Sequence, residues 1–108
     1  MKIAVTAQGS TLESPVEPRF GRCSHLLVVD SVDMGVEVLP NPYADEPGGA
    51  GTRLVSIIAD RDVEVVLTGS PGPNASVLLE TAGIRVVHGC SGTVRRALTA
   101  FVRDEPED

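Results

Sequence analysis

The chain has 108 residues, a net charge of −6, 42 % hydrophobic residues and 22 % charged residues, a composition typical of one globular domain and not of a disordered segment. Its acidic balance argues against general nucleic-acid binding, because the chain would repel phosphates, and no apolar run reaches the length of a membrane-spanning helix. Only 3 % of the residues are aromatic, so we expect an aliphatic core, which suits a buried sheet covered by helices.

The first half of the chain predicts three strands. Residues 2–7 form an apolar run that leaves no room for a signal peptide before it, so we expect a cytoplasmic protein. After a long polar loop, residues 26–30 and 36–39 predict two strands joined by a short turn, the pattern of an antiparallel hairpin. Pro40 and Pro42 end this hairpin.

The second half alternates helices and strands. Apolar residues at helical spacing predict three helices, and two apolar runs between them predict two more strands; these five elements cover residues 50–58, 63–68, 75–82, 84–88 and 94–101. Helical crossovers of this kind join parallel strands with a right-handed turn. We therefore predict a three-layer α/β fold with a mixed five-stranded sheet in the order 3-2-1-4-5 and three helices.

Four loops of the chain contain glycine, at residues 20–23, 48–51, 69–74 and 89–92. In the predicted topology all four lie at the same edge of the sheet, where strands 1, 3, 4 and 5 end and the three helices begin. Glycine allows positive φ and lets a bound group approach the backbone, and helix N-termini offer N–H groups to an anion. The sequence therefore predicts a ligand-binding edge, at the point between strands 1 and 4 where the strand order reverses.

Common catalytic motifs are missing from these loops. A Walker A loop needs a lysine after its last glycine, and the only lysine is Lys2. The dinucleotide-binding GxGxxG pattern, the nucleophile elbow of hydrolases and paired carboxylates are also not found. We therefore expect neither nuclease nor nucleotide hydrolase activity, and we expect that the protein is not an enzyme.

Thiol and imidazole groups are the remaining candidates for chemistry. Cys23, His25 and Cys90 are potential ligands of a metal or of a metal–sulfur cluster. We expect the polar loop to leave Cys23 exposed, whereas Cys90 is better explained as a small buried hydrophobe than as a ligand. Three strand spacings of about 4.8 Å separate the two cysteines, too far for a disulfide. Arg22 could compensate the charge of a cluster or pair with a nearby carboxylate.

The glycine loops and their neighbours resemble the dinitrogenase iron–molybdenum cofactor biosynthesis family of small cofactor carriers. The resemblance extends from Met1 to about Val102. The matching segments are Ser14-Pro15, Phe20-Gly21-Arg22, Asn41-Pro42, Gly48-Gly49-Ala50-Gly51, Gly69-Ser70-Pro71-Gly72-Pro73-Asn74-Ala75 and Gly92-Thr93-Val94.

This resemblance implies a ribonuclease-H-like fold without nuclease carboxylates and non-catalytic binding of an iron–sulfur, iron–molybdenum or related metal–sulfur cluster. Two positions depart from the family pattern. Arg19 stands where many members have a histidine, which removes one plausible ligand and supplies a guanidinium. Cys90 stands where relatives often have a small residue without a thiol.

Together these features predict one cofactor-binding domain over residues 1–103, followed by an acidic tail over 104–108. We expect a non-enzymatic carrier or scaffold that binds a metal–sulfur cluster, with cluster donor and acceptor proteins as partners and no role for nucleic acid or membrane. The expected cofactor-binding residues are Arg22, Cys23, Gly72, Asn74 and Gly92, and the expected metal ligands are Cys23, His25 and Cys90. Two alternatives stay open: a metal-free regulatory module that binds a small anion or nucleotide, and a protein–protein adaptor.

Overall fold

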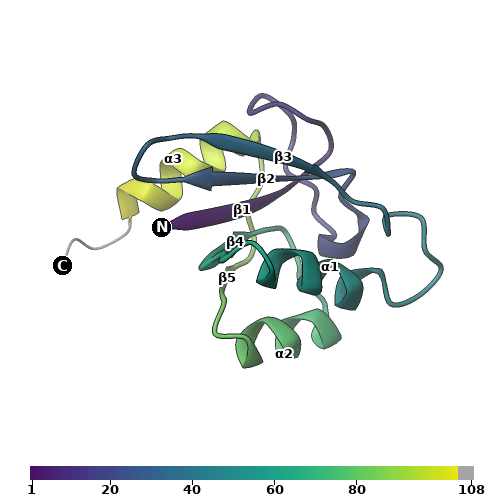
Figure 1. Cartoon of the computed structure of the whole chain (residues 1–108). Helices are drawn as coiled ribbons and strands as arrows, with labels where there is room; N and C mark the ends of the chain where they lie inside the picture. The colour runs from purple at the N-terminus through teal and green to yellow at the C-terminus, as the bar shows by residue number, and fades with distance from the viewer. Residues whose placement is uncertain (105–108) are drawn as a thin grey trace.

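Five strands form one mixed sheet in the order β3-β2-β1-β4-β5 in the computed structural model, which describes residues 1–104 (Figure 1). This is the predicted strand order. The strands are β1 (Lys2–Ala7), β2 (His25–Asp30), β3 (Val36–Pro40), β4 (Val65–Leu67) and β5 (Arg85–Val87). The helices are α1 (Ala50–Ala59), α2 (Pro73–Thr81) and α3 (Val94–Asp104), with a short 3-10 turn, η1 (Phe20–Arg22), before β2.

The strand directions follow from the connections between the strands. β2 pairs antiparallel with β1 and with β3, which confirms the hairpin, and β4 pairs parallel with β1 and with β5. The carboxyl ends of β1, β3, β4 and β5 therefore meet at one edge of the sheet. The four glycine loops lie at this edge.

The sheet separates two hydrophobic cores. Helices α1 and α2 cover one face and α3 covers the other (Figure 1). Alternate residues of β1 face opposite cores: Ala4 packs toward α1 and α2, whereas Ile3 and Val5 pack toward α3. Both faces of β1 are buried, which explains its continuous apolar sequence.

Most element boundaries differ from the sequence prediction, and three of the differences concern α2, α3 and an additional turn. Helix α2 begins at Pro73, because proline fits the first position of a helix, where its N–H would have no partner. Helix α3 continues through Asp104, so the first residue of the predicted acidic tail is helical; the rest of that tail, residues 105–108, lies outside the described residues. The turn η1 was not predicted, since three residues are too few to show a periodic pattern.

Candidate functional site

Three of the four glycine loops line one hollow of about 280 Å³ at the carboxyl edge, on the α1–α2 side of the sheet. We call it the glycine hollow. Its lining residues come from η1 and from the starts of α1 and α2: Arg19, Phe20, Gly21, Arg22, Gly49, Ala50, Gly51, Ser70, Pro71 and Gly72. No Asp or Glu occurs among the described residues that line it.

Backbone pairing holds two of these loops together. The N–H of Phe20 donates to the carbonyl oxygen of Ser70 at 3.1 Å, and the N–H of Ser70 donates to the carbonyl oxygen of Pro18 at 2.6 Å. The segment before η1 thus lies against the loop that precedes α2. Residues about 50 positions apart in the chain are fixed next to one another in this way.

The glycines of the hollow have two different roles. A Cβ atom on Gly69 would lie 2.5 Å from Cα of Pro18, and one on Gly21 would lie 2.6 Å from the backbone nitrogen of Gly51. At these two positions glycine admits the chain's own backbone, whereas the sequence predicted the approach of a bound group. Gly72 differs, because it has φ of +79° and a Cβ atom there would have no described atom within 4 Å.

Two helices begin at the glycine hollow without a side-chain cap. The N-cap residues are Gly49 for α1 and Gly72 for α2, and neither cap provides a side-chain hydrogen bond. The first N–H groups of a helix have no intrahelical partner and carry partial positive charge. Arg19 is exposed at the same hollow. The hollow is therefore suited to an anion.

Arg22 stabilises the loop that precedes α1. Its Nη1 donates to the carbonyl oxygen of Ala44 at 2.8 Å and to that of Glu46 at 2.5 Å. The predicted alternative, a pair with a carboxylate, is replaced by contacts with backbone carbonyls. Asn74, another predicted contact, is exposed in the first turn of α2.

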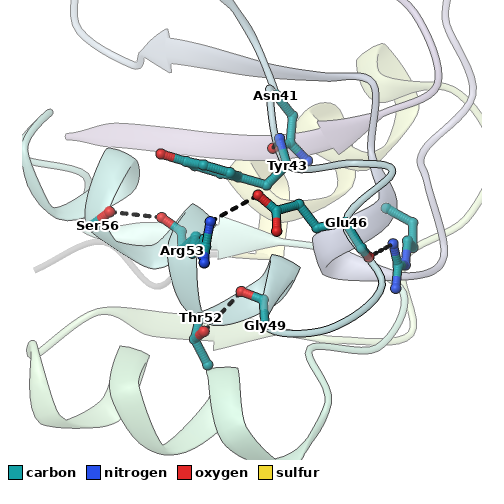
Figure 2. A network of polar contacts seen from close by, with 8 residues as sticks. Asn41, Tyr43, Glu46, Gly49, Thr52, Arg53 and Ser56 are labelled. Atoms are coloured by element: carbon teal, nitrogen blue, oxygen red, sulfur yellow. Dashed lines mark hydrogen bonds and ion pairs between the residues drawn. The ribbon is translucent and has the colours of Figure 1, made fainter.

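Side chains reinforce the same loop (Figure 2). Nη1 of Arg53 lies 2.8 Å from Oε1 of Glu46, and its guanidinium carbon lies 5.8 Å from the centre of the Tyr43 ring. The figure shows the Glu46 carboxylate directed at Arg53, with Tyr43 beside the pair. These contacts connect the loop to α1 and so help to shape one wall of the glycine hollow.

Cys23 is completely buried in the core beneath α1 and α2, so the expectation that its polar loop leaves it exposed is wrong. The loop folds inward at η1, which also buries Phe20. Nδ2 of Asn41 donates to the carbonyl oxygen of Cys23 at 2.8 Å and lies 3.7 Å from its Sγ. Burial raises the pKa of the Cys23 thiol to about 12, so the thiol is protonated at neutral pH.

Asn41 is a site residue to which the sequence prediction gave no role. Its Nδ2 also donates to the carbonyl oxygen of Gly21 at 3.1 Å, and its Oδ1 accepts from the N–H of Tyr43 at 3.0 Å. It therefore joins the end of β3 to η1. The signal in the sequence is the Asn41-Pro42 pair, which follows Pro40 at the end of the predicted hairpin.

Cys90 lies on the other side of the sheet from Cys23. It is half-buried against the α3 core, its Sγ lies 3.4 Å from the carbonyl oxygen of Val87, and burial raises the pKa of its thiol. Both cysteines are free, as predicted. Cys90 lines a second hollow of about 480 Å³, together with His88, Arg85 and Arg96. We call this the α3 hollow.

The three predicted metal ligands are not gathered at one point. Nδ1 of His25, at the start of β2, lies 2.9 Å from Oγ of Ser24, while Cys23 and Cys90 belong to opposite cores. Within residues 1–104 no group of three His, Cys, Asp or Glu side chains could hold a metal ion.

The N-terminus of α3, which includes the region of Gly92, is satisfied by the protein itself. The N–H groups of Val94 and Arg95 donate to the carbonyl oxygens of Ser14 and Leu12 at 2.9 and 2.8 Å. The N–H of Arg96 donates to Oγ1 of Thr93 at 3.1 Å, so the Thr93 side chain caps this helix. Of the three helix N-termini expected to face a ligand, two are open.

Comparison with known proteins agrees with this fold and with these motifs. The model of a family described as dinitrogenase iron-molybdenum cofactor matches residues 1–104. The chain belongs to this family. The residues that match the family model include all four glycine loops. A separate comparison with curated proteins found no match.

Solved structures of similar proteins include three that cover nearly the whole chain. The apo form of the orange protein from Desulfovibrio gigas is 38 % identical with a TM-score of 0.90, over 94 % of this chain and 87 % of that one. A putative NifB protein from Thermotoga, of the DUF35 family, is 32 % identical with a TM-score of 0.84, over 95 % and 88 %. The protein PH0822 is 29 % identical with a TM-score of 0.82, over 97 % and 93 %.

The helices of the described part of the chain are all too short or too polar to cross a membrane.

Proposed function

We propose that this protein is a non-enzymatic carrier of an anionic metal–sulfur cluster of the iron–sulfur or iron–molybdenum type, and that the glycine hollow binds the cluster. Membership of the iron–molybdenum cofactor family supports the kind of cargo. The description of one relative as an apo form and of another as a putative NifB protein agrees with such a role. The partners would be proteins that donate the cluster and accept it.

The observation that carries this proposal is that two uncapped helix N-termini and Arg19 meet at one hollow. Sulfide ligands give a metal–sulfur cluster negative charge, which N–H groups and guanidinium groups stabilise. Gly72 and Asn74 would contribute through the first turn of α2, and Arg22 through the loop that it holds. A cluster that brings its own sulfides can bind through these contacts without a cysteine ligand.

Ligation by Cys23 stays a prediction, and it requires a conformational change. The thiol is buried and protonated, so it becomes a ligand only if η1 moves away from α1 and the thiol loses its proton. Cys90 and His25 would bind a cluster away from the glycine hollow. We therefore propose contacts of charge and backbone N–H groups as the main source of affinity.

The test is anaerobic reconstitution with iron, molybdenum and sulfide, followed by desalting and analysis of bound metal and visible absorption. We expect the wild-type protein to retain metal with an absorption band and Arg19→Gln to retain several-fold less. Arg61→Gln is the matched control, because Arg61 is an exposed arginine beyond the far end of α1. Equal retention by Arg19→Gln and the wild type would exclude the glycine hollow as the site.

A metal-free anion site is the second function that uncapped helix N-termini support. Titration of the ¹⁵N-labelled protein with inorganic phosphate distinguishes it from a cluster carrier. Phosphate-dependent shifts of the first residues of α1 and α2, in a protein that retains no metal after reconstitution, would favour the regulatory module. Retained metal with weak phosphate binding would favour the carrier.

A further inference from the structure

Exposed apolar side chains gather on one part of the surface, away from the glycine hollow. The described residues expose eight large apolar side chains, and five of them lie on the β2–β3 hairpin or on α3. They are Val32, Met34, Val36, Val38 and Val102. Three of them, Met34, Val36 and Val102, line one groove, and exposed apolar side chains that gather in this way mark interaction sites more often than isolated ones do.

A groove of about 230 Å³ runs between the hairpin and α3, and we call it the hairpin groove. Its walls include Leu12, Met34, Val36, Leu98, Val102 and Arg103. It exists because α3 packs mainly over β1, whereas β3 is the outermost strand on this side of the sheet. Val36 is paired with the buried Val29 and faces the same side, but no helix covers it fully.

The backbone at the tip of the hairpin presents an apolar side chain at an unfavourable position. Met34 has φ of +61°, a conformation in which glycine or asparagine is usual. Its side chain is 62 % exposed, so burial does not compensate the strain. Strained residues recur at functional sites, and methionine adapts its shape to different binding partners.

Basic residues flank the groove although the chain has a net charge of −6. Arg95 and Arg103 both line it. Arg95 forms an ion pair with Glu13, whereas Arg103 has no ion-pair partner within the described residues. The charge beside the groove is therefore complementary to carboxylates.

We propose that the hairpin groove docks an acidic amphipathic segment of a partner protein. Its apolar side chains enter the groove between Met34 and Val102, and its carboxylates face Arg103 and Arg95. The groove is lined by α3, whereas the glycine hollow is lined by the starts of α1 and α2. Because α3 covers the opposite face of the sheet from α1 and α2 (Figure 1), a docked partner leaves the hollow open. This surface does not depend on what the hollow binds.

A synthetic helical peptide with leucine at every third or fourth position and glutamate elsewhere tests the proposal, beside the same peptide with lysine for glutamate. We expect the glutamate peptide to bind with a dissociation constant of micromolar order by calorimetry, and to shift amide signals of residues 31–38 and 95–103. We expect the lysine peptide not to bind. Arg103→Glu should raise the dissociation constant of the glutamate peptide about tenfold, and added salt should raise it further.

Met34→Gly separates docking from folding. Glycine accepts the positive φ at this position, so the urea midpoint should not fall, while affinity for the glutamate peptide should drop about tenfold through the loss of apolar contact. Val77→Ser on α2 is the matched control, because Val77 is also 62 % exposed but lies on the other side of the sheet. It should leave the affinity unchanged.

Three results would overturn the proposal. The first is no binding of the glutamate peptide up to about 1 mM, the weak limit of specific recognition. The second is equal affinity for the lysine peptide or for the Met34→Gly variant. The third is a dimer in sedimentation that Met34→Gly dissociates, because a second copy of the chain would then cover the groove.

Discussion

The α3 hollow and the glycine hollow differ in their volumes, in the side chains that line them and in the helix N-termini that reach them. The α3 hollow is the larger, at about 480 Å³, and contains a thiol, an imidazole and two guanidinium groups. The glycine hollow is smaller, at about 280 Å³, and the described residues that line it include four glycines but no thiol or imidazole. The glycine hollow nevertheless has the two open helix N-termini, because the N-cap residues of α1 and α2 are glycines and provide no side-chain hydrogen bond.

The polar loop between β1 and β2 creates this difference. Its first part runs over the start of α3, where the carbonyl oxygens of Leu12 and Ser14 accept the first helical N–H groups. Its last part lies against the starts of α1 and α2 but places η1 there, with Gly21 in backbone contact with Gly51. The loop between β1 and β2 therefore accepts the first N–H groups of α3, whereas it lies beside the N-termini of α1 and α2 without capping them. Which helix N–H groups are available at this edge therefore depends on the path of this loop and not on the side chains that line the two hollows.

The largest expected effect tests the backbone packing that forms the glycine hollow. Gly69→Ala places a Cβ atom 2.5 Å from backbone atoms of Pro18, which cannot move without breaking the pairing of Ser70. We expect a loss of about 2–3 kcal/mol in the free energy of unfolding, measured with urea. Gly48→Ala is the control, since no described atom lies within 4 Å of that Cβ position. A loss below about 0.5 kcal/mol for Gly69→Ala would show that these loops are not tightly packed.

The second effect compares the two cysteines through pH. Burial raises the pKa of Cys23 from 9.0 to about 12 in the folded protein, so above pH 9 the thiol ionises in the unfolded chain before it does so in the folded one. The contribution of Cys23 to the free energy of unfolding is therefore fully present below pH 9 and is lost as pH rises toward 12. At about pH 10.5 we expect the free energy of unfolding to be lower by about 2 kcal/mol.

Urea unfolding at several pH values measures this decline. Cys23→Ala should remove most of it, whereas Cys90→Ser should retain most of it, because Cys90 is only half-buried. The same alkaline slope in Cys23→Ala and the wild type would assign the decline to other groups.

The third effect concerns the capped and uncapped helices. Thr93→Ala removes the oxygen that accepts the N–H of Arg96, and we expect it to cost about 1 kcal/mol. The matched variant on α1 is Thr52→Ala, whose hydroxyl donates to the carbonyl oxygen of Gly49 and caps no N–H group. It should cost less than about 0.5 kcal/mol. Equal losses in urea unfolding would mean that α1 has a cap as effective as that of α3.

The smallest effect concerns the loop in Figure 2. Glu46→Gln removes an ion pair with Arg53 that is largely exposed, so we expect a change below about 0.5 kcal/mol, and smaller still in high salt. Arg22→Gln should cost more, about 1–2 kcal/mol, because it removes charged hydrogen bonds to two carbonyl oxygens. The reverse order in urea unfolding would indicate that the loop is held by the ion pair and not by Arg22.

Much of the fold was predictable because its signals are local. Strand β1 is a continuous apolar run, and α3 repeats apolar residues at helical spacing, so neither needs distant information. The short turn before β3 predicts the hairpin, and the helices between later strands predict parallel pairing. The sheet order follows from these connections. The turn η1 escaped prediction because its three residues show no periodic pattern, and the contact that buries Phe20 comes from α1, which is distant in the sequence.

By itself the sequence determined the strand order, the edge where the glycine loops meet and the family, because each depends on periodicity or on motifs at fixed spacing. Only the tertiary structure decided which groups at that edge are available. The sequence favoured Cys23 over Cys90 as the exposed thiol, yet η1 buries Cys23 completely and the sheet places the two cysteines in opposite cores. Likewise, three helix N-termini look equivalent until the polar loop satisfies that of α3. Burial and hydrogen-bond partners depend on residues far apart in the chain, and local sequence does not contain them.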